Sequence, residues 1–283
     1  MTKKLKILII CILILLIGFS FLYYNYHEKR FEVIFFDVGQ GDSALINLPG
    51  DNEIIIDGGP DKSVIYKLGK YLPVYNRDIE LMILTHPHFD HVSGLISVLD
   101  RYKVKKVMYT DVNYNSEIYD VFINKIKEKN IEIIKPDDFN EIRLDDNNIL
   151  DIIYPWENIA EKEFDDPNDS SIVVKLDTPD KDFLFMGDIE INMEEYILAN
   201  VDNDRLKADI LKGGHHGSGT SSGDLFLKVV DPKYTIISVG ENNFGLPSLR
   251  IIRRLERIGS SVLRTDQNGD IVFIAKDGKF LLK

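Results

Sequence analysis

The stretch Thr85-His86-Pro87-His88-Phe89-Asp90-His91 places three histidines and one aspartate within six residues. It follows a short apolar segment that predicts a strand, and it precedes a segment of helical periodicity. In an extended loop, His86 and His88 point to the same side because side chains alternate with period two, and Asp90 and His91 then start the helix. The four side chains can therefore converge on one small space. Imidazole and carboxylate ligands suit zinc, manganese or iron, and the ligand types alone do not choose among these metals.

A second histidine-containing loop, K-G-G-H-H-G-S-G-T at 212–220, also follows a predicted strand. Its glycines let the backbone approach a ligand closely, and its N–H groups and hydroxyls can hold a phosphate oxygen. Between the two loops, another apolar strand ends in Gly187-Asp188. An aspartate at such a place is often only a turn residue. Beside two candidate metal-binding loops, Asp188 becomes a candidate for the carboxylate that a metal pair shares.

The N-terminal region is apolar and uncharged over residues 7–24. At about 1.5 Å per residue it spans roughly 27 Å, close to the thickness of a bilayer core. Lysines precede it and tyrosines follow it, which favours a cytoplasmic N-terminus. A cleaved signal peptide and a buried helix of a soluble protein are the alternatives. The predicted parts are a cytoplasmic segment at 1–6, a transmembrane anchor at 7–24, a juxtamembrane linker at 25–30 and an outward-facing domain at 31–283.

Composition narrows the classes of function. The chain has 283 residues, with 34 Lys and Arg against 46 Asp and Glu, for a formal net charge of −12. Residues 1–30 hold five of the basic residues and one acid, so the remainder carries a formal charge of −16. Such a surface repels polyanions unless a metal or local basic groups offset it, which argues against a basic nucleic-acid-binding protein. The one cysteine, Cys11, excludes an intramolecular disulfide and a cysteine-based zinc finger.

Beyond residue 30 the periodicity predicts one α/β domain without a linker or an internal repeat. It opens with a meander of strands, continues with helices that alternate with short apolar strands, and returns to strands over 145–185. Helices are expected at 63–72, 93–102, 116–129, 190–199, 224–230 and 248–258. Strands are expected at 31–37, 43–48, 53–57, 81–84, 105–109, 131–134, 208–211 and 234–239, with three short strands at the C-terminus.

At its histidines the sequence resembles the metallo-β-lactamase superfamily, whose central motif H-x-H-x-D-H is matched by His86, His88, Asp90 and His91. More narrowly, it is similar to the extracellular domain of ComEC-type DNA-uptake proteins over nearly all of 31–273. The similarity extends to D-V-G-Q-G-D at 37–42, I-D-G-G at 56–59, N-D-S-S at 168–171, G-D at 187–188 and H-H-G-S at 215–218. It implies an α/β fold, a metallo-β-lactamase-like αββα four-layer sandwich, preceded here by one N-terminal transmembrane helix.

The resemblance also implies residue roles. One or two divalent metal ions, Zn or Mn, would lower the pKa of a bound water toward neutrality. Asp90 and His216 are the expected catalytic residues, with Asp90 orienting that water and His216 near the phosphate or leaving group. The expected metal ligands are His86, His88, Asp90, His91, Asp188 and His215. The residues expected to position the loops or to contact substrate are Gln40, Asp42, Asn168, Ser171 and Ser218.

One motif departs from the family pattern. Where the relatives have G-H-P-S, this chain has Gly245-Leu246-Pro247-Ser248. Leucine can neither bind a metal nor transfer a proton. Three outcomes stay open: one metal, two metals with a water filling the gap, or a domain that has lost its chemistry.

The resulting hypothesis is a single-pass protein of the cell membrane whose extracellular domain is a metal-dependent phosphodiesterase or nuclease acting on DNA. Its partners would be the membrane, through the N-terminal helix, and a nucleic acid. Two basic clusters, at 101–106 and 250–257, are candidate contacts for the nucleic acid. The alternative interpretation is that both are solvated helix faces. The alternatives are a hydrolase of a small ester or phosphodiester and a non-catalytic binding or scaffold module, which Leu246 favours.

Overall fold

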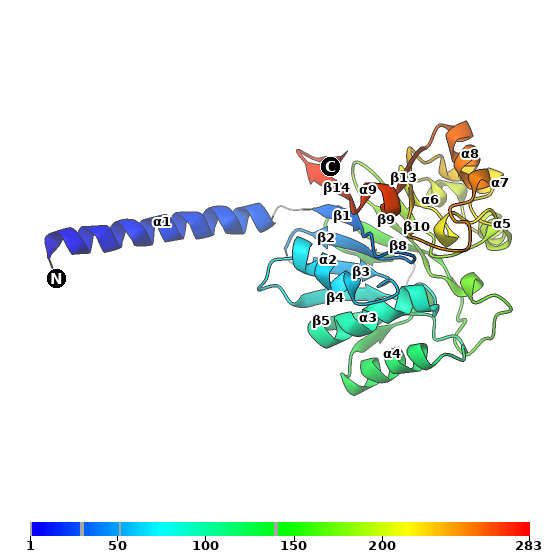
Figure 1. Cartoon of the computed structure of the whole chain (residues 1–283), viewed down its shortest axis with the longest axis horizontal. Coiled ribbons are helices and arrows are strands. Elements are labelled where there is room, and N and C mark those ends of the chain that lie inside the picture. Colours follow the sequence, from blue (N-terminus) through cyan, green and yellow to red (C-terminus); the bar gives the residue numbers. More distant parts are fainter. Residues whose placement is uncertain (1, 29–30, 51, 139–140) are drawn as a thin grey trace.

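The computed structural model describes residues 2–28, 31–50, 52–138 and 141–283. Helix α1 (Lys3–Glu28) projects from the rest of the chain as one long rod (Figure 1). Its stretch Lys3–Phe21 is long and apolar enough to cross a membrane, and none of it is buried against the domain. By length and composition it is therefore a candidate membrane span.

Fifteen strands of the described residues form two sheets. The first sheet runs in the order β15 (Lys279–Leu282), β14 (Ile271–Lys276), β1 (Glu32–Phe35), β2 (Ala44–Leu48), β3 (Asn52–Ile56), β4 (Asp78–Ile83), β5 (Lys103–Met108) and β6 (Glu132–Ile134). The second runs in the order β13 (Ser261–Arg264), β12 (Tyr234–Ile237), β11 (Ile210–Lys212), β10 (Phe183–Phe185), β9 (Val173–Asp177), β8 (Ile149–Tyr154) and β7 (Glu141–Arg143).

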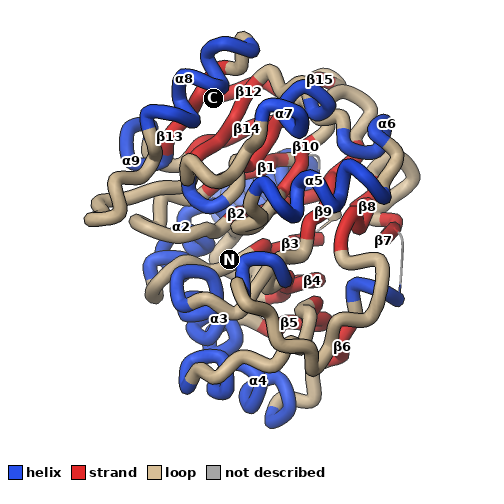
Figure 2. The backbone as a smooth tube through the Cα atoms, turned by 90° about the vertical axis from the view of Figure 1, so that its right-hand side faces the viewer, coloured by secondary structure: helices blue, strands red, loops and turns tan. Residues whose placement is uncertain are grey.

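The sheets pack face to face, and helices cover both outer faces (Figure 2). Helices α2 (Ser63–Tyr71), α3 (Phe89–Arg101) and α4 (Glu117–Glu128) cover the first sheet. Helices α5 (Ile191–Asn200), α6 (Asn203–Leu206), α7 (Asp224–Val230) and α8 (Leu249–Ile258) cover the second. The short helix α9 (Thr265–Asn268) follows β13.

Three apolar layers hold the sandwich together. Alternate residues of both sheets meet in a central core, where Phe35 stacks on Phe185 with ring centroids 5.5 Å apart. The opposite faces of the strands pack on the helices, as Ile34 and Ile237 do in the two outer layers. This period-two alternation is what makes a strand face two layers at once. The predicted αββα four-layer sandwich is confirmed.

The expected elements are present, with shifts at their boundaries. Strand β4 begins at Asp78 rather than at residue 81, because its first residues alternate between partly exposed and buried before the fully buried stretch begins. Helix α3 begins at Phe89, so that Asp90 and His91 lie in its first turn.

The topology gathers several strand ends at one edge of the sandwich. Strands β3, β4 and β5 are parallel, as are β10, β11, β12 and β13, so the carboxyl ends within each set meet. The two sheets are joined at this edge by a hydrogen bond from the backbone N–H of Ile172 to the carbonyl of Thr85, at 2.9 Å. Both histidine loops leave from this edge.

Candidate metal centre

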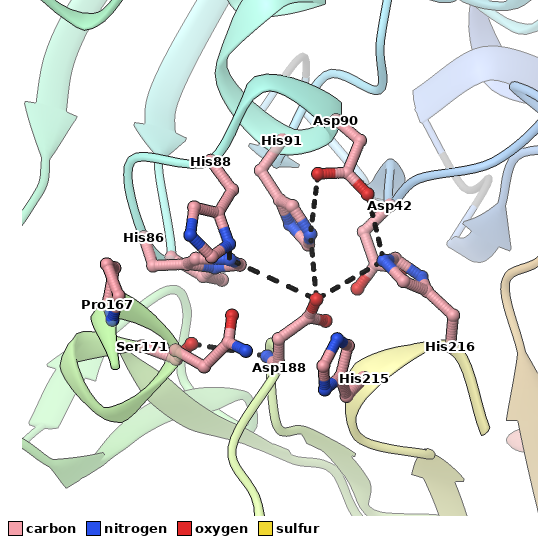
Figure 3. Close-up of polar contacts among 12 residues, drawn as sticks. Asp42, His86, His88, Asp90, His91, Pro167, Ser171, Asp188, His215 and His216 are labelled. Carbon is pink, nitrogen blue, oxygen red and sulfur yellow. Dashed lines mark hydrogen bonds and ion pairs between the residues drawn. The ribbon is translucent and has the colours of Figure 1, made fainter. Parts of the chain in front are cut away.

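The first histidine loop connects β4 to α3 and presents its side chains to one point (Figure 3). His86 Nε2 and His88 Nδ1 lie 3.0 Å apart, so the two rings turn the same way, as the alternation along an extended loop predicts. Asp90 and His91 follow in the first turn of α3. His86 and His91 are buried, His88 is half-buried, and the side chain of Asp90 is 28% exposed.

Asp188 lies in the middle of the cluster (Figure 3). Its Oδ2 is 3.3 Å from His91 Nε2, 3.2 Å from His216 Nε2 and 4.0 Å from His86 Nε2. His216 Nε2 also lies 3.1 Å from Asp90 Oδ2. Asp188 follows β10 and comes directly after Gly187, whose φ is positive at 53°. A Cβ added at position 187 would lie 2.8 Å from the Ser171 side chain, so this turn requires glycine. A single carboxylate oxygen thus faces histidines from both loops.

Asp57, which follows β3, holds the first loop from behind. Its Oδ2 lies 2.8 Å from His91 Nδ1 and accepts a hydrogen bond from Thr85 Oγ1 at 2.7 Å, while its Oδ1 accepts one from Thr85 N–H at 2.8 Å. The carboxylate therefore fixes the His91 ring with Nε2 turned toward Asp188. Carboxylate support of this kind is typical of metal-binding histidines.

His216 has the same kind of support, from Asp42 between β1 and β2 and from Ser238 after β12. Its Nδ1 lies 3.2 Å from Asp42 Oδ1 and 3.0 Å from the carbonyl oxygen of Ser238. Asp42 in turn pairs with the buried Lys212, with Nζ and Oδ2 2.5 Å apart. Because Asp42 and Ser238 lie on the Nδ1 side, Nε2 faces the cluster.

The charges explain how the cluster behaves without a cation. Burial acts to lower the pKa of His91 and of His216, but two carboxylates together outweigh it, Asp188 with Asp57 for His91 and Asp188 with Asp42 for His216, and both pKa values lie well above the ordinary 6.5. Burial acts to raise the pKa of Asp188, yet those two histidines hold it well below its usual value. For His86 burial prevails and, with the charge of His91, lowers the pKa well below 6.5. The buried carboxylates thus favour positive charge at these two imidazoles, and a divalent cation bound there would supply positive charge in place of their protons.

The two adjacent histidines of the second loop have different surroundings. His216 belongs to the cluster, whereas His215 is partly exposed and its Nδ1 lies 2.8 Å from Glu190 Oε1. Both residues have positive φ angles, 45° and 51°, so successive side chains leave the backbone in different directions. Ser218 Oγ lies 2.6 Å from Thr220 Oγ1 at the loop surface. The roles assigned to these residues from sequence stay predictions, but the geometry favours His216 over His215 as a ligand.

The remaining predicted residues support the loops. Ser171 Oγ accepts a hydrogen bond from the N–H of Asp188 at 3.2 Å, and Gln40 Oε1 accepts one from the N–H of Gly240 at 3.3 Å. Asn168 is buried, and its side-chain oxygen makes no hydrogen bond with the part of the chain that the structure describes.

Leu246 is a packing residue. It lies against the apolar layer between the second sheet and its helices. Asn242 holds its backbone by accepting from the Leu246 N–H at 3.1 Å and donating to its carbonyl at 2.9 Å. The following Ser248 donates its N–H to the carbonyl of Gly217 at 2.9 Å, so the altered motif still lies beside the second histidine loop. The donors around Asp188 assemble without a contribution from position 246.

Two supporting residues were not among the predicted site residues. Asp57 ends a strand parallel to β4 and precedes Gly58-Gly59, which is the signal that marks it. Lys212 is the last residue of β11. A charged residue at the end of a buried strand is unusual, and this position marks Lys212 as a candidate supporting residue. Another missed pair braces the second loop: Glu194 accepts from the N–H of Gly223 at 2.7 Å, and Arg254 donates to the carbonyl of Ser221 at 2.9 Å.

The donor set fits divalent metals. Among the described residues, four groups of three His or Asp ligand atoms lie within 4.8 Å of one another: His86, His91 and Asp188; Asp90, His91 and His216; Asp42, Asp57 and His91; and Asp42, Asp188 and His216. His91 Nε2 and Asp188 Oδ1 are buried without a hydrogen bond among the described residues. Buried polar atoms normally find a partner, and imidazole and carboxylate are ordinary ligands of zinc, manganese and iron.

Comparison with known proteins agrees with this geometry. The chain is 30% identical over 267 residues to ComE operon protein 3 of Bacillus subtilis, and the match covers 87% of this chain and 33% of that protein. It is 26% identical over 264 residues to Recombination protein 2 of Haemophilus influenzae, covering 91% of this chain and 31% of that one. The chain thus spans about a third of the length of these curated relatives.

Among solved structures, CmlA, a diiron beta-hydroxylase from Streptomyces venezuelae, superimposes with a TM-score of 0.51 at 11% identity, covering 86% of this chain and 54% of CmlA. At this identity the likeness concerns the fold alone. The sequence family that matches residues 36–241 is the Metallo-beta-lactamase superfamily. With its central H-x-H-x-D-H motif and its two-sheet sandwich, the chain belongs to the metallo-β-lactamase superfamily.

Proposed function

We propose that this protein is a membrane-anchored, metal-dependent phosphodiesterase that cleaves DNA outside the cell. The observation that carries the proposal is the position of Asp188, whose Oδ2 lies between histidines of both loops. A carboxylate shared between two donor sets suits a metal pair, and metal pairs are common in enzymes that hydrolyse phosphate esters. The relative named Recombination protein 2 supports DNA as the substrate class.

The residues divide into two proposed metal subsites. His86, His88 and Asp188 would hold one ion, and Asp90, His91, His216 and Asp188 would hold the other. Bound divalent ions supply a water of lowered pKa and polarise the phosphate. Asp57 and Asp42 keep the Nε2 atoms of His91 and His216 turned inward.

Asp90 has a further proposed role because it is the most exposed carboxylate of the cluster. Its side chain is 28% exposed, against 3% for Asp188 and 7% for Asp42. Burial opposes the effect, but the hydrogen bond to His216 and the charge of His91 lower the pKa of Asp90. It is therefore an ionised hydrogen-bond acceptor at the solvent side of the cluster, positioned to orient water.

The DNA-binding part of the proposal rests on helix α8 beside the second loop. Arg250 and Arg253 are exposed, and the Cδ of Arg250 lies 3.9 Å from the Cβ position of Gly219. Arg254 is buried and engaged with Ser221 and Ser222, so it braces the loop. Arg250 beside the second loop, with Arg253 on the same helix, would provide the local positive charge that an acidic domain needs to approach a polyanion.

The test uses the full chain in detergent micelles with Mn²⁺ and end-labelled single- and double-stranded DNA. We expect cleavage by the parent and by Asp204→Asn, an exposed aspartate far from the cluster in sequence, and a loss of at least about a hundredfold in Asp188→Asn. If a chromogenic phosphodiester is cleaved and the DNA is not, the protein is instead a hydrolase of small substrates. No turnover of either, with metal bound, would establish a binding module.

The membrane part of the proposal rests on α1. Lysines at its start and tyrosines after its apolar stretch favour a cytoplasmic N-terminus, which directs the domain to the outside. Protease accessibility of the domain in intact cells tests this orientation. Protection of the domain until the cells are permeabilised would contradict it.

A further inference from the structure

The end of the first sheet opposite the metal centre lies where the chain leaves α1. Strand β1 begins at Glu32, and the carbonyl of Phe31 accepts a hydrogen bond from the N–H of Ala275 at 2.8 Å. Glu32 pairs with Ile274, so the turn between β14 and β15 lies at the same end. The start of β4 and the start of β5 also lie there, because Asp78 pairs with Lys103. In Figure 1 this end of the domain faces α1.

We call this end the basal edge and define it by its exposed residues: Val74, Tyr75, Arg77, Arg101, Lys103, Lys276 and Lys279. The strands β14 and β5 are five neighbours apart in the sheet, which spreads these residues over roughly 24 Å. The edge is therefore a broad face of the domain, comparable in width to the sheet itself.

Its charge is opposite to that of the chain as a whole. Five exposed basic residues lie along it, and within the part of the chain that the structure describes none of them forms an ion pair with a carboxylate. Lysines just above the edge behave differently: Lys105 pairs with Glu80 and Lys106 with Glu132. Glu32 and Glu53, near the same end, are buried. Among the described residues of these strand ends, Asp78 and Asp277 are the acidic residues that reach solvent, and Asp180, from the loop between β9 and β10, accepts a hydrogen bond from the N–H of Phe280 at 2.6 Å beside them.

The basal edge also exposes apolar side chains. Val74 is 82% exposed and Tyr75 is 59% exposed, both in the loop that leads into β4. Exposed aromatic and aliphatic residues flanked by lysine and arginine are the composition that adsorbs to the headgroup region of an anionic bilayer.

We propose that the basal edge rests on an anionic lipid surface and holds the metal centre pointing away from the membrane. This inference rests on α1 being a membrane span, as proposed above. The chain leaves the apolar helix a few residues before β1, which keeps the basal edge near the bilayer at a high effective concentration. The six residues of β4 separate the edge from the histidine loop by roughly 20 Å. The cluster would thus face the aqueous phase, where a long polymer can reach it.

The experiment places a fluorophore at either end of the domain in the full chain. The only cysteine is Cys11, so Cys11→Ala provides the background for Val74→Cys and, separately, for Phe244→Cys. Phe244 is 78% exposed and lies in the loop that precedes Leu246, on the side of the metal centre. Each labelled chain is reconstituted into vesicles of phosphatidylcholine and phosphatidylglycerol that carry a headgroup nitroxide quencher, and flotation confirms that the chain is in the vesicles.

We expect strong quenching at position 74 and little at position 244. Lys103→Glu combined with Lys276→Glu should release the edge and lower the quenching at 74, because each basic residue beside an anionic leaflet strengthens adsorption roughly fivefold. Lys62→Glu combined with Lys135→Glu makes the same charge change after the carboxyl ends of β3 and β6, on the side of the metal centre, and should leave the quenching unchanged.

Equal quenching at 74 and 244 in chains that float would overturn the docked edge while leaving the membrane span intact. Failure of the chain to float would overturn both. Neither result touches the hydrolase proposal, since DNA cleavage is measured in detergent.

Discussion

Replacing Asp57 with asparagine tests whether the metal centre depends on a carboxylate that lies behind it. Asp57 accepts from Thr85 through both oxygens and faces His91 Nδ1 at 2.8 Å. An asparagine has the same shape, but its amide nitrogen is a donor. With that nitrogen toward His91, the Nδ1 atom must accept, and the ring proton moves to Nε2. A protonated Nε2 has no lone pair for a metal ion.

The magnitude follows from the role of the contact. Loss of a group that orients a metal-binding histidine typically weakens metal affinity by about 10- to 100-fold, or about 1.4–2.7 kcal/mol. Stability of the metal-free chain should not fall in parallel. Burial raises the pKa of Asp57, which means that the charged form is disfavoured at this site. A neutral isostere removes that cost and keeps the hydrogen bond from the N–H of Thr85.

The assay is calorimetric titration of the metal-free full chain in detergent with Mn²⁺, paired with a thermal unfolding scan before metal is added. Asp204→Asn is the matched control, because Asp204 is exposed and pairs only with Lys207 among the described residues. The reasoning predicts a large loss of Mn²⁺ affinity in Asp57→Asn with a nearly unchanged melting temperature. Unchanged affinity would refute it, and a lowered melting temperature would point to a purely structural role.

Three further predictions concern other parts of the centre. His216→Ala should lower Mn²⁺ affinity at least about tenfold more than His215→Ala, because only His216 lies within reach of Asp90 and Asp188; equal losses in the two titrations would contradict this. Gly94→Ala should lower the free energy of unfolding in urea by about 1–3 kcal/mol, since the added Cβ would lie 1.8 Å from the carbonyl oxygen of Gly58. Gly69→Ala is the matched control on α2, where an added Cβ meets open space, and it should raise the free energy of unfolding by up to about 1 kcal/mol. Mn²⁺ affinity should rise as pH increases through and beyond 6.5, because the metal must displace protons from His91 and His216, whose pKa values are raised. A pH-independent affinity would contradict the charge balance described here. In the metal-free chain, the stability contributed by those two protonated rings is present below 6.5 and is lost as pH rises through their folded-state pKa values.

Much of the fold could be predicted from the sequence, because hydrophobic periodicity records which strand faces are buried. The parallel segments carry continuous apolar runs, as at 81–84, since both faces of these strands are covered. Periodicity predicted one α/β domain, the family resemblance implied the αββα sandwich, and residues 86–91 marked the edge that carries the histidines. Boundaries were less predictable: β4 extends to Asp78 because a partly exposed strand end still pairs with β5.

The site itself was only partly predictable. Adjacent His215 and His216 have the same ligand chemistry, and the choice between them depends on local backbone angles and on the position of the Ser238 carbonyl, which sequence does not encode locally. Asp57 was hidden for a similar reason, since its partner His91 is 34 residues away and meets it only through the parallel pairing of β3 and β4.

The basic clusters show the same limit. The segment 101–106 is one run of positive charge in the sequence, but position along β5 separates it. Lys105 and Lys106 pair with carboxylates of the neighbouring strands, whereas the residues at the basal edge form no ion pair with a carboxylate in the part of the chain that the structure describes. In the other cluster, Arg254 is buried and supports a loop while Arg253 is exposed. Burial and pairing of long side chains depend on tertiary contacts, so a run of charge in the sequence does not fix its role.

The most direct test of the central claim is the number of Mn²⁺ ions bound per full chain, measured by elemental analysis after equilibrium dialysis, in the parent, in Asp188→Asn and in Asp204→Asn. We expect two ions in the parent and in Asp204→Asn, and at most one in Asp188→Asn, because both proposed subsites include that carboxylate. A parent that binds one ion or none, or an Asp188→Asn variant that still binds two, would contradict the central claim.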